Sequence, residues 1–376
     1  MTSKRAAVVM EQTLGHVTHS RNLREVAGGY AGLETTWLPI PFEIHGPARL
    51  VPMLWSNWSV RASWRARRAL DRALIAQPHD ALLFHTQVTA LFSVGLMRRF
   101  PTVVSLDATP VNYDTVGRYY GHQAAGNGPL DRQKYRMNRR VFHAAAGLVT
   151  WSDWARRSLD LDYGVDPARV RVIAPGAAPA YFGIGERRSA LSEATGGRPV
   201  RLLFVGGDFR RKGGPLLLEC MRGELADRCE LHLVTQESVP PGRNVYVHSG
   251  LRPNSPELLR LFADADIFVL PTMAECLAIA LMEATASALP VITTDVAALG
   301  EAVRPGESGL LIRPGDVSSL RRAIHTLVDD SQLRLRMGRS GFELARQKFD
   351  SRCNGRSLLD LVAEVAETGR GTRRAA

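Results

Sequence analysis

The sequence predicts an α/β protein built from two Rossmann-like halves. Short β-rich apolar runs alternate with longer helical patterns, which is typical of βαβ units and of parallel sheets covered by helices on both faces. The length of 376 residues fits two large domains. A stretch rich in Gly and Pro, 175–199, predicts the boundary because it interrupts any long regular element.

Predicted strands occur on both sides of this boundary. In the first half they are 6–10, 82–85, 102–106 and 147–150, and in the second half 201–205, 230–234, 245–248, 267–270, 290–293 and 309–312. The segment from 318 to about 367 has a helical pattern, and the last eight residues, 369–376, are expected to be a frayed tail.

Composition narrows the class of protein. A total of 48 Lys and Arg against 37 Asp and Glu gives a net charge of +11, which favours nucleic acid, an anionic membrane surface or phosphate-bearing small molecules as partners. The four Cys show no CxxC and no zinc spacing, so we expect no structural metal and a reducing compartment. No signal peptide and no run of 18 apolar residues is visible, so the expected location is cytoplasmic.

A Gly-bracketed basic turn follows the predicted strand 201–205. Gly206 and Gly207 come first, and Arg210, Arg211 and Lys212 follow. Glycines allow close approach of the backbone, and the cations lie where a parallel strand delivers its carboxyl end to the ligand crevice of an α/β sheet. The turn therefore predicts an anion site, although a solvated basic turn has the same composition.

Two carboxylates flank the start of the next predicted helix. Glu275 lies in the loop after strand 267–270, and Glu283 lies in a helix expected to begin near Leu277. Eight residues of helix span about 12 Å, which suits two parts of one extended ligand rather than a catalytic dyad. The backbone N–H groups from Cys276 to Ile279 would favour a phosphate. Glu283 lies among apolar residues, so its alternative role is to cap or to pair with an arginine in the core.

Together these motifs resemble the nucleotide-sugar-dependent retaining glycosyltransferases of glycosyltransferase family 4. The resemblance covers most of 200–330 in the right order, and a second piece spans 149–176. The matching motifs are the Gly-x₅-Lys-Gly turn (206–213), the two glutamates with seven residues between them, Ala-Ser-x-x-Pro-Val-Ile (286–292), Gly-Glu-Ala-Val (300–303) and Gly-Glu-Ser-Gly-Leu-Leu-Ile-x-Pro-Gly-Asp (306–316).

The resemblance implies the GT-B architecture, two Rossmann-like domains facing across a cleft. The implied domains are 1–180 for the acceptor, 198–350 for the nucleotide-sugar donor, and 351–376 as a helix returning to the first domain plus the tail. The acceptor would be a glycan, a lipid or a small molecule. No cofactor and no metal are implied, since the nucleotide-sugar is a co-substrate.

The resemblance also implies roles for individual residues. Lys212 would contact the donor diphosphate, Glu283 the ribose hydroxyls, and Glu275 the hydroxyls of the transferred sugar. The family is thought to use front-face attack in which the departing phosphate oxygen takes the acceptor proton, so no dedicated base is expected. Lys212 and an Arg would stabilise the charge left on the diphosphate. The implied donor-binding set is Gly206, Gly207, Arg210, Arg211, Lys212, Glu275, Cys276, Leu277, Ala278 and Glu283.

The sequence departs from the family pattern at two points. The family's Arg after the first Gly of the turn is Gly207 here, so Arg211 or Arg210 must supply the second positive charge. The family's Glu-Gly-Phe-Gly is Glu275-Cys-Leu-Ala278, which keeps the carboxylate and the helix start but loses both glycines.

Acceptor-side candidates follow strands of the first half. Gly15 is expected to form a tight turn, and His16 and His19 follow it, either facing the cleft or serving as cap and core histidines. The family's His-Asp after a central strand is replaced by 105–110, so Asp107 is the substitute candidate near the sugar and joins Glu275, Lys212 and Arg211 in the catalytic set. His85, at the end of another strand, is a candidate acceptor contact.

A basic segment with three tryptophans, 55–75, predicts an amphipathic helix. Its composition suggests peripheral association with an anionic membrane, at the inner face, although a solvated face with Trp packed in the core fits the same pattern. Asp264-Ala-Asp266 matches the metal motif of the other glycosyltransferase fold, but it opens a strand and is expected to cap the preceding helix.

Other function classes have less support. Nucleic-acid binding lacks a recognition helix, zinc spacing or an RNP-like motif. A dinucleotide-dependent oxidoreductase lacks the Gly-x-Gly-x-x-Gly fingerprint after the first strand. A catalytically silent sugar-nucleotide binder of the same fold remains the alternative to a transferase.

Overall fold

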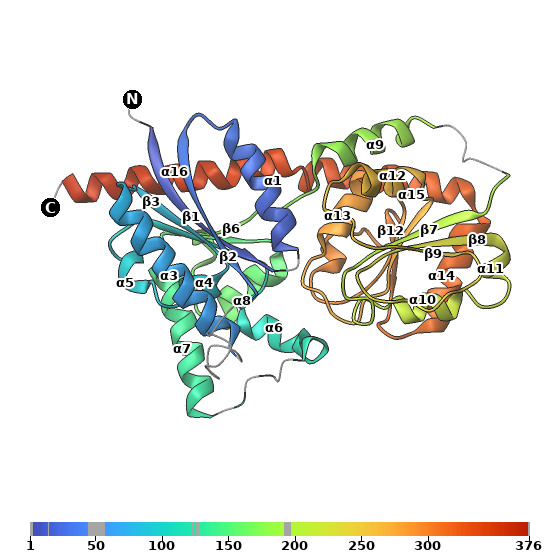
Figure 1. Cartoon of the computed structure of the whole chain (residues 1–376), viewed down its shortest axis with the longest axis horizontal. Helices are drawn as coiled ribbons and strands as arrows, with labels where there is room; N and C mark the ends of the chain where they lie inside the picture. Colours follow the sequence, from blue (N-terminus) through green and yellow to red (C-terminus); the bar gives the residue numbers. More distant parts are fainter. Residues whose placement is uncertain are drawn as a thin grey trace. The chain divides into compact units, whose positions relative to one another are not determined.

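The computed structural model describes residues 3–13, 15–43, 57–121, 124, 126, 128–191 and 197–374, with side chains to 368. The chain divides into two compact units (Figure 1). The first comprises Met1–Thr115, Ala124–Pro175 and Arg352–Ala376, and the second comprises Val116–Gln123 and Gly176–Ser351. The change from the first unit to the second at Pro175 and Gly176 lies in the Gly- and Pro-rich stretch 175–199.

The first unit holds a six-stranded parallel sheet of order β2-β1-β3-β4-β5-β6. Its strands are β1 (Lys4–Gln12), β2 (Leu33–Pro41), β3 (Ala81–His85), β4 (Thr102–Leu106), β5 (Gly147–Thr150) and β6 (Val170–Val172). Its longer helices are α1 (His16–Gly28), α3 (Trp58–Ala76), α7 (Pro129–Ala144), α8 (Asp153–Leu161) and α16 (Ser351–Arg374), and its shorter ones are α4 (Gln87–Ala90), α5 (Val94–Met97) and α6 (Pro110–Val116).

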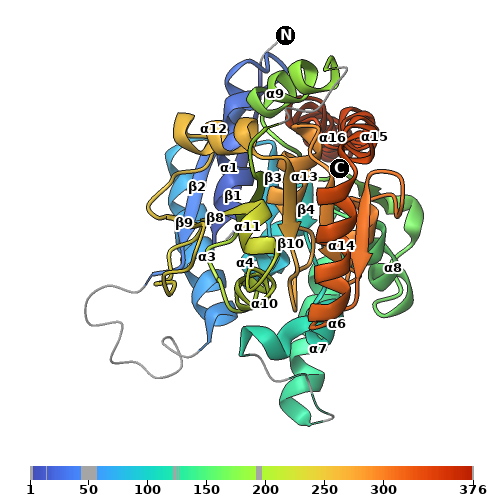
Figure 2. The ribbon, with the colours of Figure 1, turned by 90° about the vertical axis from the view of Figure 1, so that its right-hand side faces the viewer.

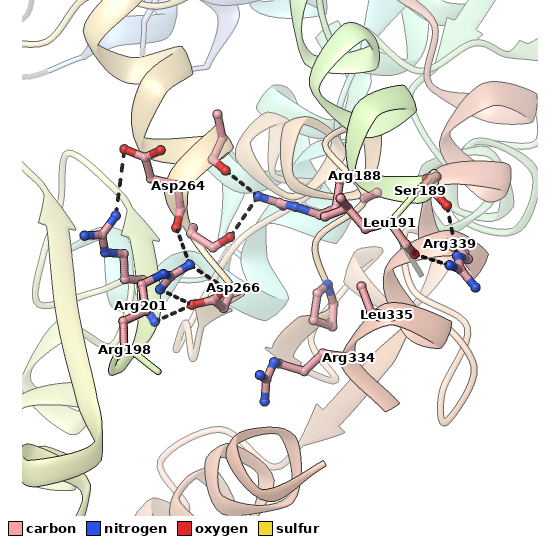
Figure 3. A pocket seen from close by; sticks show the side chains of 14 residues that line it. Arg188, Ser189, Leu191, Arg198, Arg201, Asp264, Asp266, Arg334, Leu335 and Arg339 are labelled. Atoms are coloured by element: carbon pink, nitrogen blue, oxygen red, sulfur yellow. Dashed lines mark hydrogen bonds and ion pairs between the residues drawn. The ribbon is translucent and has the colours of Figure 1, made fainter. Parts of the chain in front are cut away.

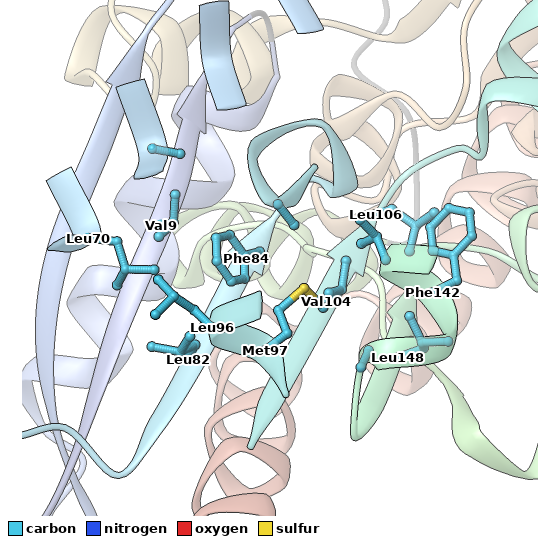
Figure 4. Packing of buried hydrophobic residues seen from close by; sticks show 14 of the residues in the cluster. Val9, Leu70, Leu82, Phe84, Leu96, Met97, Val104, Leu106, Phe142 and Leu148 are labelled. Carbon is cyan, nitrogen blue, oxygen red and sulfur yellow. The ribbon is translucent and has the colours of Figure 1, made fainter. Parts of the chain in front are cut away.

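The strands of this sheet are apolar on both faces because helices cover both. One core lies under α3 and α7, where Leu70 and Phe142 pack on Leu82, Phe84 and Val104 (Figure 4). The other core lies under α1 and α16 and includes Val8, Met10, Leu359 and Val362. The last helix of the chain therefore belongs to the first unit, and it continues to Arg374 where a frayed tail was expected from Gly369.

The second unit holds a parallel sheet of order β12-β11-β10-β7-β8-β9. Its strands are β7 (Val200–Val205), β8 (Cys229–Val234), β9 (Val245–His248), β10 (Ile267–Leu270), β11 (Val291–Thr294) and β12 (Gly309–Ile312). Its helices are α9 (Pro179–Ser189), α10 (Gly214–Cys220), α11 (Leu225–Arg228), α12 (Pro256–Asp264), α13 (Ile279–Ala286), α14 (Val317–Asp329) and α15 (Ser331–Lys348).

Helices also cover both faces of the second sheet. Helix α9 packs with α12, α13 and α15, whereas α10 packs with α14 (Figure 2). The Gly- and Pro-rich stretch 175–199 was expected to lack a long regular element, but α9 occupies its middle, with Pro179 at the first helical position where proline is tolerated.

Two parallel sheets with helices on both faces confirm the predicted fold class. In such sheets ligands bind at the carboxyl ends of the strands. Gly206 follows β7, Pro271 follows β10, and Asp295 follows β11, so these loops share one edge of the second sheet.

Candidate functional site

The basic turn after β7 folds tightly against the loop after β10. Gly213 has a φ of +82°, and a Cβ on it would lie 2.0 Å from the carbonyl oxygen of Pro271, so only glycine fits. The Met273 N–H donates to the carbonyl of Arg211 over 2.8 Å. The two loops are therefore joined through backbone, and their charged side chains are brought together.

Lys212 and Glu275 form the central ion pair of this site. Lys212 Nζ lies 2.9 Å from Glu275 Oε2, and Arg211 Nη1 lies 3.5 Å from the same oxygen. Burial alone would raise the pKa of Glu275, but the charges of Lys212 and Arg211 outweigh it and hold that pKa below its ordinary value. The site thus contains an ionised carboxylate between two cations.

Arg211, and not Arg210, lies with Lys212 beside Glu275. Its side chain is only 4% exposed, and Nε donates to Asp208 Oδ2 over 2.9 Å while Nη1 donates to the Ala274 carbonyl over 2.6 Å. Arg210 is exposed, and no ion pair to it is found among the described residues. At Gly207 nothing lies within 4 Å of a Cβ, so the space beside the turn is open where the family carries an arginine.

Tyr120 is a site residue that the sequence pattern did not indicate. It lies in a short helical turn, Gly117–Tyr120, within the segment that clusters with the second unit. Its hydroxyl accepts from Arg211 Nη1 over 3.0 Å and donates to Glu275 Oε1 over 3.4 Å, and the Arg211 guanidinium lies 4.1 Å from the ring centre. Tyr120 is 91 residues from Arg211 in sequence, and no local pattern links the two.

Glu283 lies inside α13, with 5% of its surface exposed. Burial raises its pKa to about 7, against smaller opposing effects of the Tyr181 hydroxyl and Lys212. The alternative of a core pairing with an arginine is not found, because no arginine within ion-pair distance of Glu283 is present among the residues with described side chains. A carboxyl group with such a pKa, on the same helix that follows Glu275, is typical of a ligand site.

The loop between the two glutamates differs in detail from the expectation. Helix α13 begins at Ile279 and not near Leu277, so Cys276, Leu277 and Ala278 precede the helix and are buried. Ala278 has φ −79° and ψ 121°, a region open to any residue, and no positive φ occurs at Cys276 or Leu277. The loop therefore reaches the helix start without the glycines of the family pattern.

Asp264 and Asp266 do not cap α12. Asp266 accepts from the backbone N–H of Arg201 over 2.8 Å and from Arg198 over 2.7 Å, and Asp264 lies 3.9 Å from Arg201. Both precede β10, at the amino ends of the strands, and so lie at the opposite sheet edge from Lys212. Among the residues that the structure describes, no group of three or more His, Cys, Asp or Glu is placed to hold a metal.

The acceptor-side candidates gather at the carboxyl ends of β1, β3 and β4 in the first unit. His16 Nδ1 lies 2.8 Å from His85 Nε2, and His16 Nε2 lies 3.8 Å from Asp107 Oδ2. Gly15 is the residue before α1 with φ −64°, so its role as a turn does not depend on a glycine-only conformation.

His85 is a supporting residue in this cluster. It is 1% exposed, its ring stacks on Trp151 at 5.3 Å, and its Nδ1 lies 3.3 Å from Ser105 Oγ. Burial, followed by the neighbouring His16 and His19, lowers its pKa well below the ordinary value, so the ring is neutral. His85 is therefore buried and contacts His16 directly, and its role as an acceptor contact stays a prediction.

His19 is a buried histidine of the core, one of the two roles expected for it. It is 5% exposed and lies between His85 and Trp151 at 4.9 and 5.3 Å, and burial lowers its pKa to about 3. Glu11, at the end of β1, accepts from Thr13, Trp58 and Thr86 over 2.7, 3.1 and 2.6 Å and so fixes the loops around the cluster.

Two Rossmann-like units, with cations and carboxylates joined at the carboxyl ends of the second sheet, define a protein of the GT-B class. Comparison with known proteins adds the family. A family model described as "Glycosyl transferase 4-like domain" matches residues 14–176, and one described as "Glycosyl transferases group 1" matches residues 199–330. The chain belongs to the family 4 glycosyltransferases.

Individual relatives match at low to moderate identity. D-inositol 3-phosphate glycosyltransferase of Corynebacterium efficiens is 32% identical over 225 residues, 54% of this chain and 53% of that protein. Glycogen synthase of Mycobacterium tuberculosis is 26% identical over 330 residues, 81% of this chain and 72% of that protein. The chain spans about half the length of the first curated relatives that it matches.

Solved structures share the fold. Sucrose-phosphate synthase from Thermosynechococcus elongatus superposes with a TM-score of 0.74 at 16% identity, covering 97% of this chain and 100% of that one. HepE of Anabaena, solved in complex with UDP-glucose, gives a TM-score of 0.65 at 14% identity, covering 96% of this chain and 99% of that one. In the described part of the chain, no helix is long and apolar enough to cross a membrane.

Proposed function

We propose that the chain is a retaining hexosyltransferase that moves a sugar from a nucleoside-diphosphate sugar to an acceptor hydroxyl. The observation that carries this proposal is the pairing of Lys212 and Arg211 with Glu275 at the carboxyl edge of the second sheet. Relatives named as glycosyltransferases and the UDP-glucose complex of HepE support a nucleotide-sugar donor.

Lys212 and Arg211 stabilise the leaving diphosphate in this proposal. Cleavage of the sugar–phosphate bond places extra negative charge on the departing oxygen, and fixed cations in a partly buried site lower the barrier to that charge. A metal ion is then not required for this step. The departing phosphate oxygen takes the proton of the acceptor hydroxyl on the same face of the sugar, which preserves the anomeric configuration.

In this proposal the two carboxylates bind different parts of the sugar nucleotide. Ionised Glu275 accepts from hydroxyls of the transferred sugar, and Glu283 accepts from the ribose hydroxyls. Asp107 and His16 act on the acceptor side, with His85 holding the His16 ring in place.

A thermal-shift screen tests the donor. UDP, GDP, ADP and their sugars are added to the whole chain, and the matching nucleotide should raise the melting temperature by mass action. The donor that binds is then tested for transfer with and without EDTA, and the anomeric configuration of the product is read by NMR. Inversion, or full loss of activity with EDTA, would overturn those parts of the proposal.

A catalytically silent binder of the same fold is separated by turnover. Slow hydrolysis of the bound nucleotide-sugar, detectable without knowledge of the acceptor, is expected for a transferase. Binding with no release of free sugar above background would favour the silent alternative.

We also propose peripheral contact of α3 with an anionic membrane. Trp64, Arg68, Arg72 and Ile75 share one exposed helix face, and Ile75 is 87% exposed. Trp58 instead packs inward and donates to Glu11, so only part of the aromatic content is in the core; Trp55 lies outside the described residues. Flotation with vesicles containing anionic lipid should carry the protein, and Arg68→Glu with Arg72→Glu should abolish it. Equal flotation with neutral vesicles would end this proposal.

A further inference from the structure

A second polar pocket lies in the second unit, away from Lys212 and Glu275. Its volume is about 320 Å³, and it lies at the amino ends of β7, β10 and β11, where Arg201, Asp266 and Pro290 line it (Figure 3). The donor loops follow the carboxyl ends of the same strands. Because β10 has four residues at about 3.3 Å each, the two edges are separated by about 13 Å of strand.

Positive charge in this pocket exceeds negative charge. Five arginines line it, against two aspartates. Arg198 pairs with Asp266 over 2.7 Å, and Arg201 pairs with Glu230 over 2.9 Å and Asp264 over 3.9 Å. The remaining three arginines, Arg188, Arg334 and Arg339, donate to backbone carbonyls, and no carboxylate within ion-pair distance of them is found among the described residues.

Arg334 is the most informative of the three. It is 9% exposed, and its Nη1 donates to the carbonyls of Leu327 and Val328 at the end of α14. Figure 3 shows the Arg334 side chain among those that line the pocket. Burial, and then the like charge of Arg198, lowers its pKa against the opposing effect of Asp266.

Arg188 is a second pocket arginine that donates to backbone carbonyls and has no ion pair among the described residues. Nη2 donates to the carbonyls of Phe262, Ala263 and Ala265, and Nη1 to that of Ser287. Burial lowers its pKa to about 10. Removing guanidinium groups from water without a counter-charge costs free energy, and an anion in the pocket would offset that cost.

We propose that this pocket binds a phosphomonoester as a second ligand site, separate from the proposed donor site. A phosphomonoester carries close to two negative charges and three acceptor oxygens, which matches arginines that present parallel N–H groups. Leu191, Leu335 and Pro290 provide an apolar wall for the organic group. The volume lies at the lower end of the range of about 300 to 1,000 Å³ typical of small-molecule sites, larger than phosphate alone needs.

Calorimetric titration of the whole chain in phosphate-free buffer tests the proposal. Phenyl phosphate should bind more tightly than inorganic phosphate, because its ring contacts the apolar wall. It should also bind at least about tenfold more tightly than phenyl sulfate, which has one negative charge fewer. No saturable binding of phenyl phosphate would overturn the proposal.

Variants locate the binding. Arg334→Gln keeps amide N–H groups for the α14 carbonyls and should weaken the binding of phenyl phosphate by at least about tenfold. Arg336 lies on α15 like Arg334, and its side chain is 61% exposed, so Arg336→Gln should leave the affinity for phenyl phosphate unchanged. Lys212→Ala should also leave it unchanged; loss in Lys212→Ala with retention in Arg334→Gln would place the ligand in the donor site and overturn the proposal.

A second variant covers the case in which Arg334→Gln fails to fold. Arg339 is exposed and donates to the carbonyls of Ser189 and Leu191. Arg339→Gln should weaken phenyl phosphate with an unchanged circular dichroism spectrum. Unchanged affinity in a folded Arg339→Gln protein would count against the assignment.

Discussion

Lys212 Nζ lies 2.9 Å from Glu275 Oε2, so the cation proposed for the donor diphosphate is paired with the carboxylate proposed for the sugar. A diphosphate must therefore compete with Glu275 for Lys212 and Arg211. The same carboxylate favours a whole nucleotide-sugar and disfavours the nucleoside diphosphate left after transfer. This relationship gives two different expectations for substrate and product.

Glu275→Gln separates these two effects. Removal of the negative charge should tighten binding of the nucleoside diphosphate about fivefold, as expected for roughly 1 kcal/mol from one partly buried charge. Transfer should fall by at least a hundredfold, because the sugar loses a charged acceptor and Lys212 is no longer oriented. Titration calorimetry and initial rates measure the two quantities. Weaker diphosphate binding with retained transfer would contradict both roles.

Arg211 and Arg210 form a matched pair of variants. Arg211→Lys keeps a charge but cannot contact Asp208, Ala274 and Tyr120 together, so kcat should fall by about a hundredfold. Arg210→Lys and Arg210→Ala, at an exposed neighbour, should change kcat by less than about twofold. Melting curves show whether Arg211→Lys remains folded. A larger effect at Arg210 than at Arg211 would reverse the assignment.

Tyr120 predicts a graded result. Tyr120→Phe keeps the ring 4.1 Å from the Arg211 guanidinium and removes the hydroxyl shared with Arg211 and Glu275, so kcat/KM should fall about tenfold. Tyr120→Ala should cost more, because the cation–π contact is also lost. Tyr119→Phe is the control, since its hydroxyl contacts Arg118. Equal activity of the wild type and Tyr120→Ala would exclude Tyr120 from the site.

Most of the fold follows from local pattern. Apolar runs bounded by Gly, Pro and Asp place all ten predicted strands within one or two residues of their observed ends. The two missed strands, β2 and β6, are the edges of the first sheet. β2 contains Pro39 and Pro41, which an edge strand tolerates, and β6 has only three residues, so neither has the apolar pattern of a central strand.

The sequence pattern does not predict helix α9, because glycines such as those at 183 and 185 are typical of turns. A Cβ on Gly185 would lie 2.2 Å from the carbonyl oxygen of Ala286, so this glycine allows close packing of α9 on α13. Packing between distant segments leaves no local trace. Sequence motifs are enough to nominate Lys212, Glu275 and Glu283 as donor-site candidates. The contacts of Tyr120 and the arginine pocket depend on packing between distant segments, so no motif indicates them.

Glu283 predicts opposite pH effects on stability and on donor binding. Its pKa is raised by burial from 4.5 to about 7 in the folded chain, so between those values the unfolded chain loses its proton first and stability falls as pH rises. Above pH 7 the buried, ionised Glu283 lowers the free energy of unfolding by about 3 kcal/mol. Glu283→Gln should therefore melt several degrees higher than the wild type at pH 8 and equally at pH 4, while Glu307→Gln, at an exposed glutamate, should show no pH-dependent difference.

Nucleotide binding should change in the other direction. The ionised carboxylate accepts more strongly from ribose hydroxyls than the protonated one, so wild-type affinity should rise from pH 6 to pH 8. Glu283→Gln should bind nucleotide about tenfold more weakly at pH 8 and lose this rise. Melting curves and titrations at both pH values measure the pair of effects. A Glu283→Gln protein that melts lower at pH 8 yet binds nucleotide normally would show a structural carboxylate with no ribose contact.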